Sequence, residues 1–234
     1  MKITIPESIN DITLGAFQKY HELLQREDLQ QFDFDKRKIE IFTALKREDI
    51  SNIKQSDFKF IIDKIDIALE QNVAFEPTFK IKDVEFGFIP NLDEISLGEF
   101  SDLDNYFGKW DKMHNVMAVL YRPVIEKNKH NQYLIAPFNN VEEFGNLMKY
   151  TPLSVALSSH VFFWNLEKEL LQATISYLEK ILMKMTKVNK AILVKKLNLA
   201  NNGDGIRAFM QSQRETLENL MKSSDLNYLP SLTF

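Results

Sequence analysis

Apolar residues in the amino-terminal part of the chain recur at three- and four-residue intervals, the spacing of one face of a helix. The pattern predicts a first helix capped by the hydroxyl of Thr13, a second over residues 35–46 and a third over residues 56–71. A short strand over residues 2–5 is expected before them. Each of the three helices is amphipathic, so each is expected to turn one apolar face inward.

Residues 75–89 change to an alternating pattern. Residues 78–81 and 84–88 alternate apolar and polar side chains around the dipeptide Lys82-Asp83. Alternation with a period of two across a tight polar turn is typical of a β-hairpin. A second hairpin is expected from residues 124–125 and 133–135, which are separated by a polar stretch.

Helix-start signals mark the regions around these hairpins. Ser96 and Glu99 have the spacing of a capping box, which predicts a helix over residues 96–107. Another helix is expected over residues 109–121, and it stops there because a proline follows two residues later. A short helix capped by Asn140 is expected over residues 140–150.

Thr151-Pro152 predicts a further helix start, since a hydroxyl cap is followed by proline at the first helical position. From Leu153 onward neither Pro nor Gly occurs until Gly203, and the apolar periodicity continues to Met185. A helix of about 34 residues would be about 50 Å long. Because this exceeds an ordinary globular helix, we interpret it as a spine or an interface element.

These elements predict a mainly α fold of the α+β kind, in which helices accompany two small β-hairpins. Residues 1–150 are expected to form a mixed α+β domain and residues 151–200 the long spine helix. Residues 201–234 are expected to form a C-terminal helical arm that ends in an apolar tail. The low counts of Gly and Pro, 7 of each, favour helices over a sandwich or barrel with many tight turns.

Two strand-to-helix junctions repeat a similar sequence. Residues 5–17 read Ile-Pro-Glu-Ser-Ile-Asn-Asp-Ile-Thr-Leu-Gly-Ala-Phe, and residues 89–100 read Ile-Pro-Asn-Leu-Asp-Glu-Ile-Ser-Leu-Gly-Glu-Phe. Both copies place a glycine, Gly15 or Gly98, at the second helical position, where it lowers helix propensity. A glycine in both copies suggests close backbone approach there. The echo reflects either a duplicated strand-loop-helix unit or convergence of two junctions on the same residue types.

Composition and motifs limit the chemistry of the chain. It contains no Cys, which removes disulfides, thiolate metal ligands and Cys nucleophiles. It has no Gly-rich phosphate loop and no Gly-x-Ser-x-Gly elbow, and its four His residues lack His-x-x-x-His spacing. We therefore expect no catalytic residue, no cofactor, no metal and no small-molecule ligand. An enzyme whose site is assembled from dispersed carboxylates and His is the alternative from another class.

Charge and hydropathy also bear on the partners. A net charge of −4 argues against a general nucleic-acid binder, because phosphate neutralisation needs a basic footprint. The most apolar stretch, residues 153–166, is shorter than the roughly 20 apolar residues that cross a bilayer. No membrane partner is expected, and synthesis in the cytoplasm is the default.

The charged residues are segregated into an acidic block, residues 83–108, and a basic block, residues 180–196. The acidic block has seven Asp or Glu and no Lys or Arg, whereas the basic block has six Lys and no Asp or Glu. We predict that the acidic block of one copy meets the basic block of a neighbour, in a contact that closes into a ring or continues as a helical array. The interface candidates are Asp93, Glu94, Glu99, Asp102, Asp104, Lys184, Lys187, Lys190, Lys195 and Lys196. Two alternatives stay open: both blocks are solvated faces, or the basic block lies near DNA.

The tail, residues 224–234, provides a second candidate surface. Its apolar side chains are uncommon for a terminus left free in water, and they make Tyr228, Leu229, Leu232 and Phe234 further interface candidates. The tail either folds back on its own core or inserts into a neighbouring subunit.

Four segments carry a resemblance to a known group of proteins. They are residues 85–96 (Glu-Phe-Gly-Phe-Ile-Pro-Asn-Leu-Asp-Glu-Ile-Ser), 102–106 (Asp-Leu-Asp-Asn-Tyr), 117–123 (Met-Ala-Val-Leu-Tyr-Arg-Pro) and 162–166 (Phe-Phe-Trp-Asn-Leu). With them the chain resembles an uncharacterised group of structural or assembly proteins of tailed bacteriophages, which includes crAss-like phages of Bacteroidetes hosts. The resemblance extends over about residues 10–180. It implies a neck, ring or tail component of the virion, or a tail assembly chaperone.

The expected function is therefore that of a non-enzymatic structural protein of the phage head–tail junction or tail. Its expected partners are further copies of itself, in a ring-like homo-oligomer, and other phage structural proteins. Its expected location is the virion, assembled in the host cytoplasm. The first alternative is a tail assembly chaperone that is not retained in the virion, and the second is the enzyme with a dispersed site.

Overall fold

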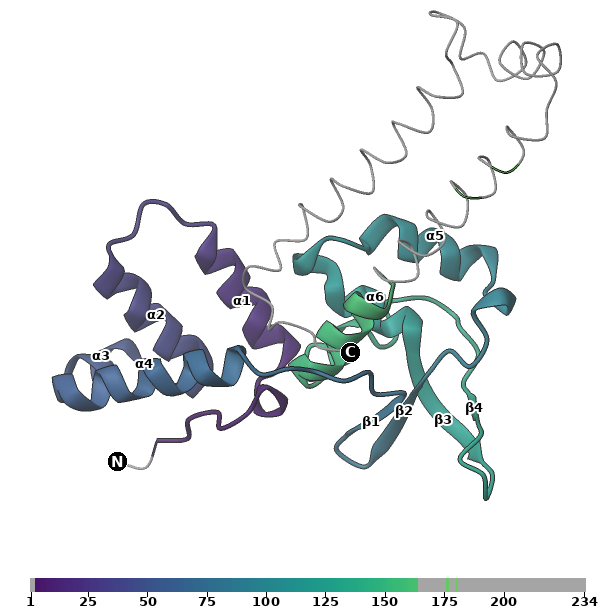
Figure 1. Ribbon diagram of the computed structural model, residues 1–234, viewed down its shortest axis with the longest axis horizontal. Helices are drawn as coiled ribbons and strands as arrows, with labels where there is room; N and C mark the ends of the chain where they lie inside the picture. Colours follow the sequence, from purple (N-terminus) through teal and green to yellow (C-terminus); the bar gives the residue numbers. More distant parts are fainter. Residues whose placement is uncertain (1–2, 164–175, 177–179, 181–234) are drawn as a thin grey trace, which may run out of the picture. The chain divides into compact units, whose positions relative to one another are not determined.

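The structure is a computed structural model that describes residues 3–163 and the single positions 176 and 180 (Figure 1). Of Asp93 it describes the backbone alone. The described residues up to Ser159 belong to one compact unit, and a second unit begins at His160. The first unit combines helices with a small antiparallel sheet, which confirms the mainly α, α+β fold class.

The amino-terminal part of this unit is a group of helices that pack on their own apolar cluster (Figure 1). After a 3-10 turn, the helices are α1 (Leu14–Leu24), α2 (Gln31–Thr43), α3 (Arg47–Ser51) and α4 (Gln55–Leu69). Helical spacing brings apolar residues of α2 and α4 to one side, where they form a buried cluster with one residue of the α2–α3 loop and one of α3. Its members are Ile39, Leu45, Ile50, Ile61 and Ile65.

The sequence pattern locates α1, α2 and α4 and misses the short helix α3. Thr13 caps α1 as predicted, because its Oγ1 accepts the Ala16 N–H at 3.2 Å. Helix α2 begins at Gln31, before the expected residue 35, and it ends where Ala44 takes a left-handed backbone angle (φ 57°). Helix α3 has 5 residues, too few to show a helical period. The expected strand over residues 2–5 is wrong for its described part, because residues 3–5 are not in a strand.

Both predicted hairpins form, and they join into one four-stranded antiparallel sheet. The strands are β1 (Thr78–Ile81), β2 (Val84–Phe88), β3 (Tyr121–Lys127) and β4 (Tyr133–Ile135), in the order β1-β2-β3-β4. The hairpins meet because β2 pairs with β3, with Gly87 opposite Arg122. Hairpin turns are local and can be read from sequence, whereas the pairing of β2 with β3 connects segments more than thirty residues apart.

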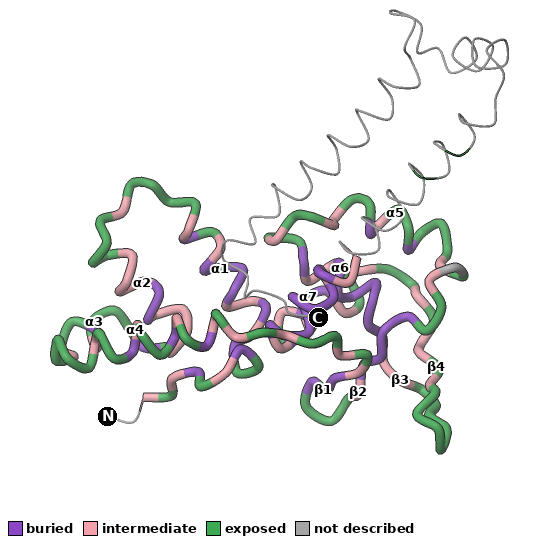
Figure 2. The backbone as a smooth tube through the Cα atoms, viewed as in Figure 1, coloured by how far each residue is buried: buried purple, intermediate pink, exposed green. Residues whose placement is uncertain are grey.

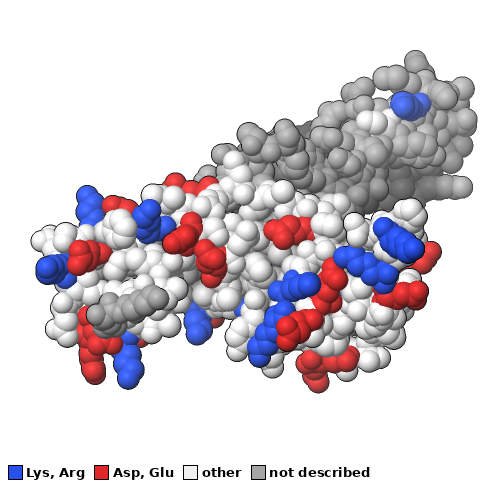
Figure 3. Space-filling view, turned by 90° about the horizontal axis from the view of Figure 1, so that it is seen from below, with Lys and Arg blue, Asp and Glu red and all other residues white. Residues whose placement is uncertain are grey.

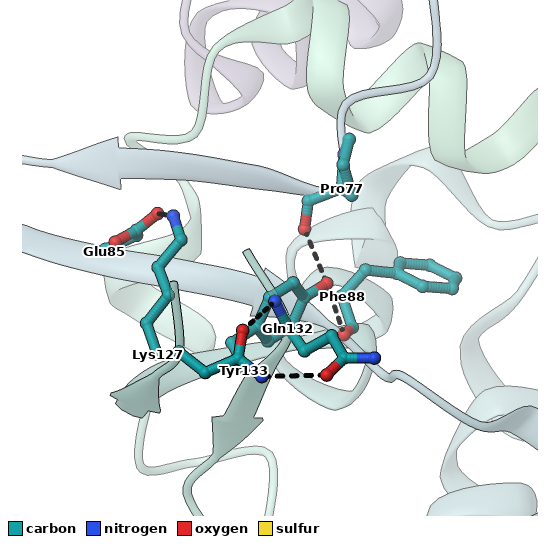
Figure 4. Close-up of polar contacts among 7 residues, drawn as sticks. Pro77, Glu85, Phe88, Lys127, Gln132 and Tyr133 are labelled. Carbon is teal, nitrogen blue, oxygen red and sulfur yellow. Dashed lines mark hydrogen bonds and ion pairs between the residues drawn. The ribbon is translucent and has the colours of Figure 1, made fainter. Parts of the chain in front are cut away.

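Tyr133 of β4 contacts both strands of the first hairpin at its open end, where β1 begins and β2 ends (Figure 4). Its hydroxyl lies 3.0 Å from the carbonyl oxygen of Phe88 and 3.1 Å from that of Pro77, either of which can accept its proton. The ring crosses Gly87 so closely that a Cβ there would lie 2.4 Å from it. Lys127 adds an ion pair to Glu85 at 2.7 Å. The contacts of Tyr133 explain how the three-residue edge strand β4 keeps its register, and the Lys127 ion pair joins β3 to β2.

The centre of the unit is helix α6 (Met113–Leu120), which follows the 3-10 turn η3 (Trp110–Lys112) (Figure 2). Met113 and residues 116–120 are buried, whereas the polar residues His114 and Asn115 near the start of the helix are half-buried. The chain passes from α6 directly into β3 at Tyr121. The predicted helix over residues 109–121 is therefore confirmed in position but divided into a turn and a shorter helix. Tyr121 is fully buried and donates to the Glu76 carbonyl oxygen at 2.7 Å.

The remaining elements complete the described part of the chain. They are η2 (Leu92–Glu94), α5 (Leu97–Tyr106), α7 (Gly145–Met148) and a helix described over 153–163. Helix α7 is shorter than the helix predicted over residues 140–150, because Asn140 caps a turn before it, accepting the Glu143 N–H at 3.0 Å. The predicted start after Thr151-Pro152 is confirmed. The rest of the expected spine helix, the C-terminal arm and the tail lie outside the described residues.

The echo between residues 5–17 and 89–100 is matched by local structure. In each copy a 3-10 turn, η1 (Ile9–Asp11) or η2, leads to a hydroxyl cap and an α-helix. The surroundings of the two glycines differ. A Cβ at Gly15 would lie 3.1 Å from the Lys149 carbonyl oxygen, whereas a Cβ at Gly98 would meet nothing nearer than the Ser96 Oγ at 3.9 Å. The predicted close approach is confirmed at Gly15, and at Gly98 no such approach occurs among the residues that the structure describes.

We predict opposite effects of alanine at the two glycines. Gly15→Ala should lower the free energy of unfolding by about 1 kcal/mol, because the crowding of Lys149 outweighs the gain in helix propensity. Gly98→Ala should raise it by about 0.5 kcal/mol, since the new methyl group enters open space. Urea unfolding followed by circular dichroism measures both. Equal shifts of the same sign would contradict the described contact at Gly15.

A second prediction concerns pH and the contact between α1 and α6. Gln18 donates to Nδ1 of His114 at 2.9 Å, so the imidazole is neutral there. Burial, helped by Lys149 and Lys112, lowers the pKa of His114 below its ordinary value of 6.5. The unfolded chain therefore takes up the proton first, and stability should fall as the pH drops from 6.5. Thermal unfolding of His114→Asn should show a shallower fall, although His160, whose pKa burial also lowers, keeps part of it.

Candidate protein-interaction site on helix α5

Helix α5 is fixed at its amino terminus by the predicted capping box. The Ser96 Oγ accepts the Glu99 N–H at 3.2 Å, and Glu99 Oε2 accepts the Ser96 N–H at 2.7 Å. These two bonds satisfy amides that the first turn of a helix leaves without intrahelical partners. The capping box therefore sets where the helix begins and turns Glu99 toward the interior.

The second carboxylate oxygen of Glu99 binds α5 to the sheet. Glu99 Oε1 lies 2.7 Å from a guanidinium nitrogen of Arg122 on β3. The exposed fractions of the two side chains are 7% and 10%, so the pair is shielded from water. Burial lowers the pKa of Arg122, and the neighbouring carboxylate of Glu99 opposes that shift. Arg122 also lies over the ring of Phe138, with 5.9 Å from the guanidinium carbon to the ring centroid.

The inward side of α5 is set by this ion pair, and its other side is left apolar and exposed. Glu99 and Leu103, four residues apart, are both buried. Leu97 and Phe100, which are three residues apart and so lie next to each other on the helix surface, have exposed fractions of 83% and 57%. Two large apolar side chains therefore stand in solvent on a helix that cannot rotate to bury them.

Carboxylates surround this exposed pair. Glu94 and Asp104 are exposed and Asp102 is half-buried. Glu99, a predicted interface residue, has a different role, because its carboxylate is already taken up inside the unit by Ser96 and Arg122. We call Glu94, Leu97, Phe100, Asp102 and Asp104 the outer α5 face. A sequence signal for its apolar part was available, because a buried capping-box Glu99 places position 97 on the opposite side of the helix, and position 100 is the neighbour of 97 one turn later.

The other predicted interface residues lie outside what the structure describes. They are the side chain of Asp93, the basic-block residues Lys184, Lys187, Lys190, Lys195 and Lys196, and the tail residues Tyr228, Leu229, Leu232 and Phe234. The meeting of the acidic and basic blocks stays a prediction. On the described part of the face in Figure 3, acidic and basic side chains are interspersed.

A small depression lies between α1 and α2, with a volume of about 270 Å³. Its charged lining consists of Lys19, Glu22, Arg26, Arg37, Glu40 and Arg47. Arg47 forms an ion pair with Glu40 across this lining, and Arg26 forms one with Asp28 outside it. The lining has no His, and the described residues contain no group of three His, Asp or Glu that could hold a metal. Within the same residues, no helix has the length and apolarity to span a membrane.

We predict that the Glu99–Arg122 pair dominates the stability of α5. Glu99→Gln should lower the free energy of unfolding by about 3 kcal/mol, because it leaves the Arg122 cation buried without a counter-charge. Glu94→Gln, the same change at an exposed position, should stay within about 0.5 kcal/mol of the original chain. Urea unfolding measures both. If the two variants unfolded alike, the buried pair would not be holding the helix.

Comparisons with known proteins give no further guide to this site. The chain matches no protein-family model, no curated protein and no solved structure. The function is therefore argued from the residues themselves and from the resemblance carried by residues 85–96, 102–106, 117–123 and 162–166.

Proposed function

We propose that this chain is an assembly protein that binds copies of itself and other subunits through the outer α5 face. In line with the phage resemblance, we propose that it is a structural component of the head–tail junction or tail. The observation that carries the proposal is the exposure of Leu97 and Phe100 among carboxylates on a helix locked by a buried ion pair.

The composition of the outer α5 face supports protein binding. Exposed side chains of single apolar residues are ordinary on a surface, but Leu97 and Phe100 lie one helical turn apart and form a continuous apolar strip. Burying such a strip against a partner contributes about 25 cal/mol per Å² of apolar surface. The flanking carboxylates of Glu94 and Asp104 favour a partner with positive charge and repel one with negative charge.

The rigidity of α5 supports the same conclusion. A binding helix that is already ordered loses little conformational entropy when its partner arrives, so more of the contact energy appears as affinity. The capping box and the Arg122 ion pair provide this order before any partner is present. A merely solvated face would need neither the apolar strip nor the buried anchor.

We propose the basic block of a neighbouring copy, residues 180–196, as the partner of the acidic residues. The contact joins two different surfaces of the chain, so it is heterologous and propagates from copy to copy. Depending on the rotation per subunit, such a contact closes a ring or continues as a helical array. Both are geometries that a neck or tail component of a virion uses.

The proposal predicts that charge reversal on the outer α5 face abolishes self-association. Glu94→Lys with Asp104→Lys should leave a monomer in about 50 mM salt, because like charges then face the basic block. Asp63→Lys with Glu70→Lys, exposed positions within and just after α4, gives the same change in net charge and should assemble like the original chain. Light scattering coupled to size-exclusion chromatography measures the mass.

A charge swap sharpens this test. Lys187→Glu with Lys190→Glu should also abolish assembly, and mixing that protein with the α5 reversal should restore it. Assembly by the α5 reversal alone would sink the proposal. Detecting the chain in purified particles would separate a virion component from a chaperone that leaves before maturation.

A further inference from the structure

The amino terminus of α1 is covered by residues 149–152 of the same chain, the turn that follows α7. The amides of Leu14 and Gly15, the first two helical residues, donate to the carbonyl oxygens of Thr151 and Lys149, both at 2.8 Å. The helix terminus thus obtains partners for amides that no intrahelical carbonyl can reach. An isolated antiparallel bridge between Thr13 and Pro152 continues the contact.

This covering segment requires the glycine and buries the apolar residues of the junction. The Lys149 carbonyl approaches Gly15 so closely that a Cβ would lie 3.1 Å from its oxygen. Leu14 has an exposed fraction of 0% and Phe17 one of 6%. Leucine, glycine and phenylalanine at these spacings therefore form a seat for the backbone carbonyls of residues 149–151.

The amino terminus of α5 has the same three residues and no occupant among the described residues of a single chain. Leu97, Gly98 and Phe100 stand where Leu14, Gly15 and Phe17 stand in the first copy, but Leu97 is 83% and Phe100 57% exposed. The amides of Leu97 and Gly98 have no hydrogen-bond partner within the part of the chain that the structure describes. We call Leu97, Gly98 and Phe100 the open seat.

Gly98 shows that the open seat is more than an exposed apolar pair. Its backbone angle is not left-handed, and a Cβ would meet only the Ser96 Oγ at 3.9 Å. Nothing within the described fold therefore requires glycine there, although glycine costs helix propensity that alanine would restore. A backbone that approaches from another chain would require it, as Lys149 does at Gly15.

The chain carries an unassigned copy of the segment that fills the first seat. The tripeptide Tyr-x-Pro occurs at residues 121–123, which pair in β3, at residues 150–152, which cover α1, and at residues 228–230 in the tail. Proline holds the residue before it in an extended conformation, which presents carbonyl groups to a neighbouring backbone. Residues 149–152 read Lys-Tyr-Thr-Pro and residues 227–230 read Asn-Tyr-Leu-Pro.

We propose that residues 227–232 of a second copy occupy the open seat, with the carbonyls of Asn227 and Leu229 accepting the amides of Gly98 and Leu97. Leu229 takes the place of Thr151, so its apolar side chain covers Leu97, and Leu232 covers Phe100. Residues 164–226 separate this segment from the continuously described part of the chain, a length sufficient to reach a neighbour. This inference rests on the proposed function and adds a second contact between the subunits, beside the one between the acidic residues and the basic block.

Disulfide trapping tests the contact directly, because the full chain contains no Cys. Ser101 is exposed one turn after Leu97, and Ser231 lies in the tail, so Ser101→Cys and Ser231→Cys change one atom each. Under mild oxidation a mixture of the two single variants should give a dimer in which peptide mass spectrometry finds a disulfide between positions 101 and 231. Ser56→Cys on α4, mixed with Ser231→Cys, is the matched control and should give at least tenfold less linked dimer.

A blocking substitution completes the experiment. Adding Gly98→Val to the Ser101→Cys chain should reduce the linked dimer at least tenfold while thermal unfolding stays unchanged, because the side chain occupies space that is open among the described residues. Equal linking with Ser56→Cys, or full linking with Gly98→Val, overturns the proposal. A single chain that carries both Ser101→Cys and Ser231→Cys serves as a further test. If the disulfide forms only within that chain, the assignment to a second copy is overturned.

The same experiment separates this inference from the proposed function. Loss of the link in chains that still self-associate in a charge-dependent way would refute the tail contact alone. Chains that neither link nor self-associate would refute both.

Discussion

The carboxylate of Glu99 uses both of its oxygens inside the protein, one on the backbone amide of Ser96 and one on the guanidinium of Arg122. The pair lies where water does not screen it, so its rupture would leave a charge in a medium of low polarity. This contact joins the amino-terminal cap of α5 to strand β3 of the sheet. Because it fixes the rotation of α5 about its own axis, it also decides which residues of that helix remain outside.

The two echoed junctions show how one local sequence serves two surroundings. Both begin with a 3-10 turn and a hydroxyl-capped helix, since these features depend on residues a few positions apart. At α1 the leucine and phenylalanine enter the core under residues 149–153, whereas at α5 the ion pair directs the helix so that the same residues face solvent. A motif that forms a core contact in one copy is thereby presented as a surface in the other.

A surface of this kind suits a protein whose work is assembly. The described residues combine a packed centre, where α6 buries six of its eight residues, and a peripheral helix held rigidly with apolar and acidic side chains outward. Rigid presentation lowers the entropy cost of binding, and the acidic rim discriminates among partners by charge.

The sequence by itself determined the elements that depend on neighbouring residues. These are the caps of Thr13 and Ser96, both hairpins, the start of the helix after Pro152 and the echo, because caps, turns and periodicity act over a few positions. Only the tertiary structure decided that the hairpins join through β2 and β3, that Glu99 meets Arg122, and that Leu14 is buried whereas Leu97 is exposed. Each of these depends on which distant segment packs against the element, and a local pattern contains no information about that neighbour.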